Sequence, residues 1–133
     1  MLCKRTYKLL IVDDEKGLCN ELKALLEEQG YVVLTAHNGH EALELLKQEE
    51  VHALVSDVYM PVMDGLDLLV QARRNYPDLK LLAFSGGDRT ESVKMSNDSI
   101  LKAIEKFGQI EVLRKPMRAE FLLERVSSLL KEA

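Results

Sequence analysis

The chain has 133 residues, of which 47% are hydrophobic and 30% are charged, and its formal net charge is −4. This length suits a single folded domain, and the composition excludes a disordered or collagen-like chain. No apolar stretch approaches the roughly 20 residues of a membrane span, the first residues do not form a secretory signal, and the negative charge disfavours nucleic acid as the default partner.

Short apolar runs alternate along the chain with longer amphipathic stretches. The runs lack the polar alternation of half-exposed strands, which is typical of strands covered on both faces of a sheet. In chain order we expect a strand over 9–12, a helix over 15–29, a strand over 32–34, a helix over 39–49, a strand over 53–55, a helix over 65–75, a strand over 81–84, a helix over 98–107, a strand over 110–113 and a helix over 118–131.

The helix predictions depend on apolar residues that recur at helical spacing and on local stop signals. In the first helix, Leu18, Leu22, Leu25 and Leu26 share one face. Gly30 follows as a C-terminal stop, and later helices end near Pro77 and Gly108 in the same way.

Five strands that alternate with five helices predict an α/β fold, a doubly wound (βα)5 parallel sheet with helices on both faces. In such sheets the functional site lies beyond the carboxyl ends of the strands, where the strand order reverses. The residues directly after each strand therefore carry most of the functional information.

Chemically useful side chains follow four of the five expected strands. Asp13 and Asp14 follow the first strand, and the third run ends at Asp57. The fourth run ends at Ser85, and Lys115 follows the fifth. If the sheet is parallel, an acidic pair, a carboxylate, a hydroxyl and an ammonium meet at one edge.

Three carboxylates held close together repel one another, and a divalent cation removes this conflict. A donor set made only of oxygen suits Mg²⁺ or Mn²⁺ better than zinc. A metal, a lysine and a hydroxyl around a carboxylate nucleophile form a site for phosphoryl transfer. The acidic loop from Asp13 to Gly17 argues against a flavin phosphate site, and the sequence has neither GxxxxGK[ST] nor GxGxxG.

The sequence closely resembles the receiver domain of two-component response regulators. The resemblance is carried by Val12-Asp13-Asp14-Glu15, by the segment from Asp57 to Gly65 with Met60-Pro61 and Met63-Asp64, by Ser85, and by Lys115-Pro116. It covers about residues 7–131. It implies a flavodoxin-like fold with strand order 2-1-3-4-5.

The resemblance implies a metal site. Asp14 and Asp57 would bind Mg²⁺ directly, together with the backbone carbonyl of Tyr59. Asp13 would act mainly through a metal-bound water.

The resemblance also assigns the phosphoryl chemistry. Asp57 would accept a phosphoryl group, Lys115 would pair with its oxygens, and Ser85 would donate a hydrogen bond to it. The backbone N–H groups of Tyr59 and Gly86 would complete the phosphate site, and Pro116 is expected in the cis form.

The implied partners are a histidine kinase or histidine phosphotransfer protein as donor, and a downstream protein as target. The phosphorylated state would be recognised at the face of the fourth helix, fifth strand and fifth helix, and a homodimer through this face is left open. We expect one cytoplasmic receiver domain over 1–133, without an output domain in this chain, and no direct binding to nucleic acid or membrane. Its only reactions would be its own phosphorylation and dephosphorylation.

The chain departs from the family pattern in three places: at Val112, in the stretch from Gly86 to Asn97, and at Tyr59 and Gly87, whose positions in receivers tend to tune how fast water reaches the acyl phosphate. Val112 stands where many receivers carry an aromatic residue, three positions before the lysine. The stretch from Gly86 to Asn97 is longer and more polar than usual and is interpreted as an insertion.

Two other functions stay open from the residues. One is a Mg²⁺-dependent phosphatase with Asp57 as nucleophile, and the other is an interaction module that does not depend on phosphorylation. Simple structural roles are also considered: Asp13 or Asp14 could be a helix N-cap, His37 and His40 are taken as structural rather than metal ligands, and Cys3 and Cys19 are expected as reduced thiols.

Overall fold

The computed structural model describes residues 7–57, 65–85, 110–114 and 119–131. Its centre is a parallel sheet of five strands in the order β2-β1-β3-β4-β5. The order is the one that the resemblance implied, and every expected strand is present. The strands are β1 Lys8–Val12, β2 Val32–Ala36, β3 Ala53–Asp57, β4 Lys80–Ser85 and β5 Ile110–Arg114.

Four helices lie within the described residues: α1 Lys16–Glu28, α2 Gly39–Gln48, α3 Gly65–Asn75 and α5 Ala119–Lys131. They confirm the helices expected over 15–29, 39–49, 65–75 and 118–131, with small differences at the ends. The helix expected over 98–107 and the insertion from Gly86 to Asn97 lie outside the described residues.

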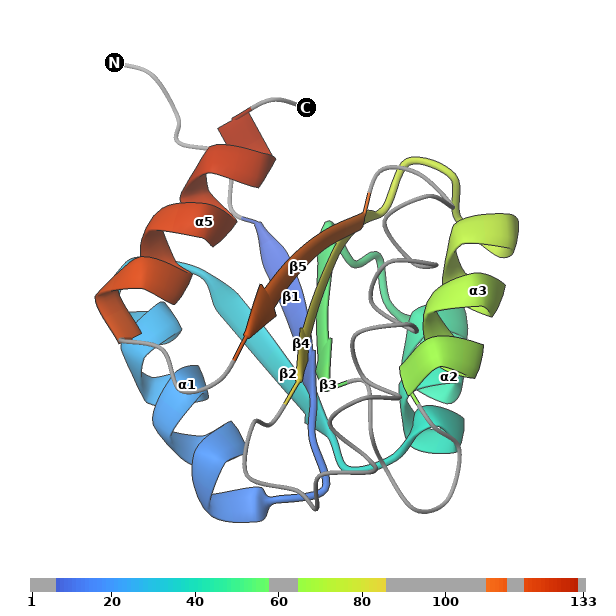
Figure 1. Cartoon of the computed structure of the whole chain (residues 1–133), viewed down its shortest axis with the longest axis horizontal. Helices are drawn as coiled ribbons and strands as arrows, with labels where there is room; N and C mark the ends of the chain where they lie inside the picture. The colour runs from blue at the N-terminus through green and yellow to red at the C-terminus, as the bar shows by residue number, and fades with distance from the viewer. Residues whose placement is uncertain (1–6, 58–64, 86–109, 115–118, 132–133) are drawn as a thin grey trace.

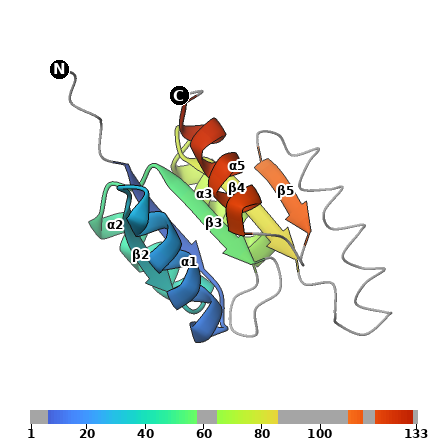
Figure 2. The same cartoon turned by 90° about the vertical axis from the view of Figure 1, so that its left-hand side faces the viewer.

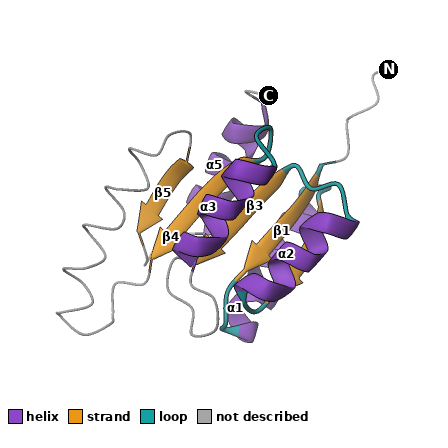
Figure 3. Ribbon diagram, turned by 90° about the vertical axis from the view of Figure 1, so that its right-hand side faces the viewer, coloured by secondary structure: helices purple, strands orange, loops and turns teal. Residues whose placement is uncertain are grey.

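The helices cover both faces of the sheet, as Figure 1 shows. Helices α1 and α5 lie over one face (Figure 2), and α2 and α3 lie over the other (Figure 3). Neighbouring residues of one strand therefore face different layers: Leu9 and Ile11 pack in the cluster with α1 and α5, whereas Leu10 and Val12 pack in the cluster with α2 and α3. This explains why the strand sequences are continuously apolar.

The end of α1 shows how a local signal sets the direction of the chain. Gly30 has a φ of +98°, its N–H donates to the carbonyl of Glu27, and the N–H of Tyr31 donates to the carbonyl of Leu26. These two bonds form a Schellman motif, which satisfies carbonyls that the helix leaves unpaired. Gly30 therefore ends the helix, as the sequence predicts, and turns the chain into β2.

The register of the strands brings their carboxyl ends to one edge of the sheet. Val12 of β1 pairs with Ala36 of β2 and with Ser56 of β3, and Ser85 of β4 pairs with Arg114 of β5. Residues that follow these positions share that edge. In the described parts of the chain, no helix has the length and apolar character needed to cross a bilayer.

Candidate functional site

Three carboxylates meet at the carboxyl edge of the sheet. Asp13, Asp14 and Asp57 each place a carboxylate oxygen such that all three atoms lie within 4.8 Å of one another. Asp13 and Asp57 are buried, with 1% and 2% of their surface exposed, whereas Asp14 is exposed. The cluster thus has a buried base and an open side that solvent reaches.

The pairing of β1 with β3 brings the acids together. Val12 pairs with Ser56 in a parallel register. The next residue in each chain segment, Asp13 after Val12 and Asp57 after Ser56, therefore lies beside the other. Asp57 is the last residue of β3 and still pairs with Phe84 of β4. Two central strands thus place acids that are far apart in the sequence at one point.

Asp13 is held at its backbone and at its side chain. Its N–H donates to the carbonyl of Ala36 over 3.1 Å, and its Oδ1 accepts a hydrogen bond of 2.9 Å from the N–H of Glu15. The second bond is the two-residue turn that aspartate side chains commonly make. Glu15 is the N-cap of α1, and its side chain makes no capping hydrogen bond. The interpretation of Asp13 or Asp14 as the N-cap is therefore wrong.

Two side chains lie close to the carbonyl oxygen of Asp13. The Sγ of Cys19 lies 3.3 Å from it, and the Nδ1 of His37 also lies 3.3 Å from it. Cys19 is fully buried and His37 is half-buried. The sequence did not indicate that either residue belongs to the site. Every residue has a backbone carbonyl, so the sequence cannot show which carbonyl a side chain will contact.

The donor set of the cluster fits a hard divalent cation. All three groups offer carboxylate oxygen, the ligand type that Mg²⁺ and Mn²⁺ prefer, and Mg²⁺ usually keeps several waters beside one or two carboxylates. The exposed side at Asp14 leaves room for such waters. Among the described residues these acids form the one group of three potential metal ligands, and neither His37 nor His40 belongs to it.

The remaining predicted site residues are only partly described. Ser85 ends β4 at the same edge of the sheet, paired in register with Arg114 of β5. Tyr59, Gly86, Lys115 and Pro116 lie outside the described residues. The structure thus brings three of the predicted residues together, places the backbone of a fourth at the same edge, and leaves the others as predictions.

A separate cavity of about 620 Å³ lies among residues that precede the strands, with Tyr7, His52 and Lys80 in its lining. The ring of His52 serves the fold there: its Nδ1 accepts a hydrogen bond of 2.9 Å from the N–H of Lys8, and Tyr7 packs edge-on against it. In parallel α/β sheets, functional sites lie at the opposite end of the strands. The acidic cluster is therefore the stronger candidate.

Comparisons with known proteins show which proteins the chain is similar to. Residues 9–127 match the family model described as response regulator receiver domain. The chain is 35% identical over 126 residues to Response regulator MprA of Mycobacterium ulcerans. The aligned region covers 95% of this chain and 51% of that relative. The chain thus spans about half the length of the curated relatives it matches.

Solved structures show the same similarity at the level of the fold. The receiver domain of the Francisella response regulator 1452 aligns with a TM-score of 0.78 and 31% identity, over 96% of this chain and 98% of that one. The signal receiver domain of an HD domain-containing protein from Pseudomonas fluorescens Pf-5 aligns with a TM-score of 0.84 and 26% identity, over 99% and 92%.

Proposed function

This chain belongs to the response regulator receiver domain family, and on that premise we propose that Asp57 is its phosphoacceptor. The observation that carries the proposal is the meeting of Asp57 with Asp13 and Asp14 at the carboxyl edge of the sheet. A lone buried carboxylate would be costly to keep charged. A cluster that a divalent cation can neutralise gives these buried acids a chemical purpose.

In the proposed reaction, a carboxylate oxygen of Asp57 attacks the phosphorus of a phosphohistidine or a small acyl phosphate. A bond forms between this oxygen and phosphorus, and the bond from phosphorus to the donor breaks with its electron pair going to the donor. The product is an acyl phosphate on Asp57. Burial of Asp57 at the end of β3 fixes the nucleophile, and the exposed Asp14 marks the side from which a donor would approach the cluster.

Asp13, Asp14 and Asp57, with the backbone carbonyl of Tyr59, would hold Mg²⁺. The bound ion would neutralise charge on the transferring oxygens. Lys115 would contribute a second positive charge, and Ser85 with the N–H groups of Tyr59 and Gly86 would contribute hydrogen bonds to the phosphoryl group. Asp13 would act mainly as an acceptor for a water bound to the ion.

We further propose that the chain acts as one receiver unit in the cytoplasm, phosphorylated by a histidine kinase or histidine phosphotransfer protein. Phosphorylation would shift the population between two conformations and change a protein-binding surface that includes β5 and α5. The protein would be a phosphoacceptor and not a turnover enzyme. The relatives named as response regulators support this role.

Intact-mass spectrometry tests the proposal directly. The protein is incubated with acetyl phosphate and MgCl₂, as wild type and as Asp57→Asn. We expect one added phosphoryl group on the wild type, and none on the variant or on the wild type with EDTA. Asp57→Asn keeps the shape of the side chain and removes the nucleophilic charge, so it is the matched control.

Other results would favour the competing functions. Repeated turnover of a chromogenic phosphate ester, without a stable adduct, would indicate a phosphatase. No adduct from acetyl phosphate and no binding of beryllofluoride, an analogue of the phosphoryl group, would favour an interaction module that does not depend on phosphorylation.

A further inference from the structure

The carbonyl group of Asp13 has two side-chain partners that no step of the proposed reaction uses. Cys19 Sγ and His37 Nδ1 each lie 3.3 Å from its oxygen. A carbonyl oxygen can only accept hydrogen bonds, and it has two lone pairs. For the His37 contact to be a hydrogen bond, its Nδ1 atom must carry the hydrogen, whereas the thiol of Cys19 can donate here or to the carbonyl of Ala36, which lies 4.0 Å from Sγ.

The orientation of this carbonyl affects the side chains of both Asp13 and Asp14. It belongs to the planar peptide group that joins Asp13 to Asp14. Rotation of this group changes the directions in which both side chains leave the backbone. Two donors on its oxygen, together with the bond from the N–H of Asp13 to Ala36, restrict that rotation.

The two side chains come from different parts of the chain, Cys19 from α1 and His37 from the loop between β2 and α2, and His37 is itself anchored. Its N–H donates to Oε1 of Glu41 over 3.0 Å, and the N–H of Glu41 donates to the side chain of Asn38 over 2.9 Å. Asn38 is the N-cap of α2. The imidazole ring is thus connected to the start of α2, whereas Cys19 belongs to α1.

We infer that His37 is a positioning residue of the acidic cluster, whose Nδ1–H, beside the thiol of Cys19, holds the peptide group between Asp13 and Asp14 in the orientation that binds Mg²⁺. The inference rests on the proposed role of the cluster in Mg²⁺ binding. Loss of a partner that orients a ligand side chain commonly lowers metal affinity by about 10- to 100-fold. Because His37 acts through the backbone, we expect a loss of about three- to tenfold, below that range.

The test compares His37→Asn with His37→Leu. The amide nitrogen of asparagine and a methyl carbon of leucine both branch from Cγ, as Nδ1 of histidine does, so the variants are similar in shape and differ in the donor. Titration calorimetry with MgCl₂ is expected to give about three- to tenfold weaker binding for His37→Leu, and binding within about twofold of wild type for His37→Asn.

Val33→Ala is the control for a general loss of stability. Val33 is buried in β2, the strand that precedes His37, and pairs with Leu9 at the other end of β2 from the acidic cluster. This variant should lower the stability of the fold and leave the affinity for Mg²⁺ unchanged. A purely structural role of His37 would likewise lower the stability of His37→Leu and leave its affinity for Mg²⁺ unchanged.

The outcomes separate this inference from the proposed function. Wild-type protein that binds Mg²⁺ with the same affinity as His37→Leu would overturn the inference and leave the proposed function intact. Wild-type protein that binds no Mg²⁺ would overturn both.

A spectroscopic measurement on the wild type needs no folded variant. Long-range ¹H–¹⁵N correlation spectra of the neutral imidazole are expected to show the proton of His37 on Nδ1. A proton on Nε2 alone would contradict the inference.

Discussion

At the residue scale, Gly30 and Gly17 show how one residue type serves two conformations. Gly30 has a φ of +98°, where a side chain is unfavourable, whereas Gly17 lies in the first turns of α1. A Cβ atom built on either residue would meet no atom within 4 Å. Any difference between alanine variants at the two positions therefore reports on the backbone alone.

We expect Gly30→Ala to lower the free energy of unfolding by about 1 kcal/mol, because a left-handed backbone is strained for alanine. Gly17→Ala should raise it by about 0.5 kcal/mol, because alanine restricts the unfolded chain and favours the helix. Urea denaturation measures both changes. Destabilisation by both variants to the same extent would contradict this account of Gly30.

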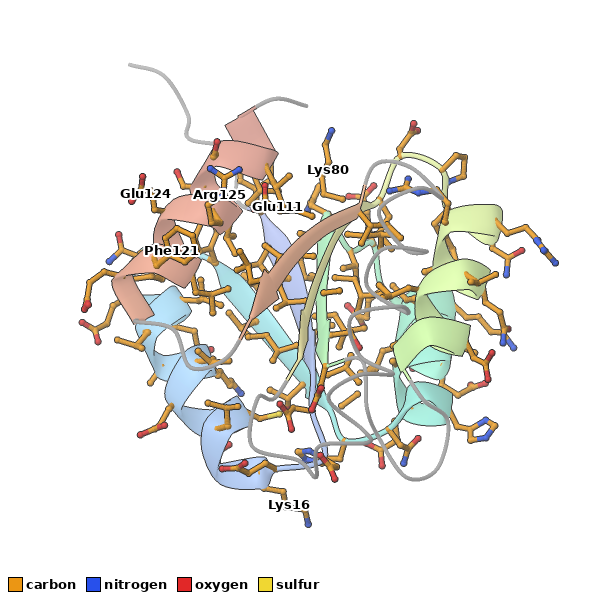
Figure 4. All side chains as sticks on the ribbon, in the orientation of Figure 1. Lys16, Lys80, Glu111, Phe121, Glu124 and Arg125 are labelled. Carbon is orange, nitrogen blue, oxygen red and sulfur yellow. The ribbon has the colours of Figure 1, made fainter. Side chains whose placement is uncertain are left out.

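At the element scale, a salt bridge joins the edge strand β5 to helix α5. The guanidinium of Arg125 in α5 donates two hydrogen bonds to the carboxylate of Glu111 in β5, one of them 2.7 Å long from Nε to Oε2. The two side chains are 32% and 23% exposed, and Figure 4 shows them side by side. Two parallel hydrogen bonds between a guanidinium and a carboxylate fix the relative orientation of the two groups as well as their distance.

A double-mutant cycle of Glu111→Ala and Arg125→Ala should give a coupling free energy of about 0.5–1 kcal/mol, the upper part of the range for partly exposed pairs. Thermal or urea unfolding of the four proteins provides the measurement. Arg125→Lys keeps the charge and loses the forked geometry, so it should recover only part of this coupling. A coupling near zero would mean that the pair does not hold α5 on β5.

At the scale of the whole molecule, the sheet separates two apolar clusters, and the acidic cluster lies at its carboxyl edge. The cores on both faces keep the central strands in register, so they can hold like charges together at that edge. Because like charges repel, we expect this arrangement to lower the stability of the fold when no cation is bound. The fold and the site thus contribute with opposite signs to the free energy of unfolding.

We expect Asp14→Asn to be more stable than the wild type in EDTA, by about 0.5 kcal/mol, because Asp14 is exposed and solvent screens its repulsion. With MgCl₂ at about ten times the dissociation constant, the wild type should gain about 1.4 kcal/mol. Asp14→Asn should gain clearly less. Urea unfolding in the two buffers measures the change, and equal gains would exclude Asp14 as a ligand.

The fold was predictable to a large extent because its signals are local. The continuously apolar strands predict a sheet covered on both faces, and Gly30 predicts the end of α1. The strand order is different: it followed from the resemblance, because which strands pair depends on contacts between distant residues. The acids of the site were predictable because parallel strands bring their carboxyl ends to one edge.

By itself, the sequence determined the alternation of strands and helices, and it identified Asp13, Asp14 and Asp57 as acids that meet at the carboxyl edge of the sheet. The apolar periodicity, the positions of glycine and the chemistry of carboxylates depend on the residues themselves, so they can be recognised in the sequence alone. Only the tertiary structure decided that Cys19 and His37 meet at the carbonyl of Asp13. Every residue carries such an acceptor, and only the packing of α1 and β2 against β1 selects which donors reach this one.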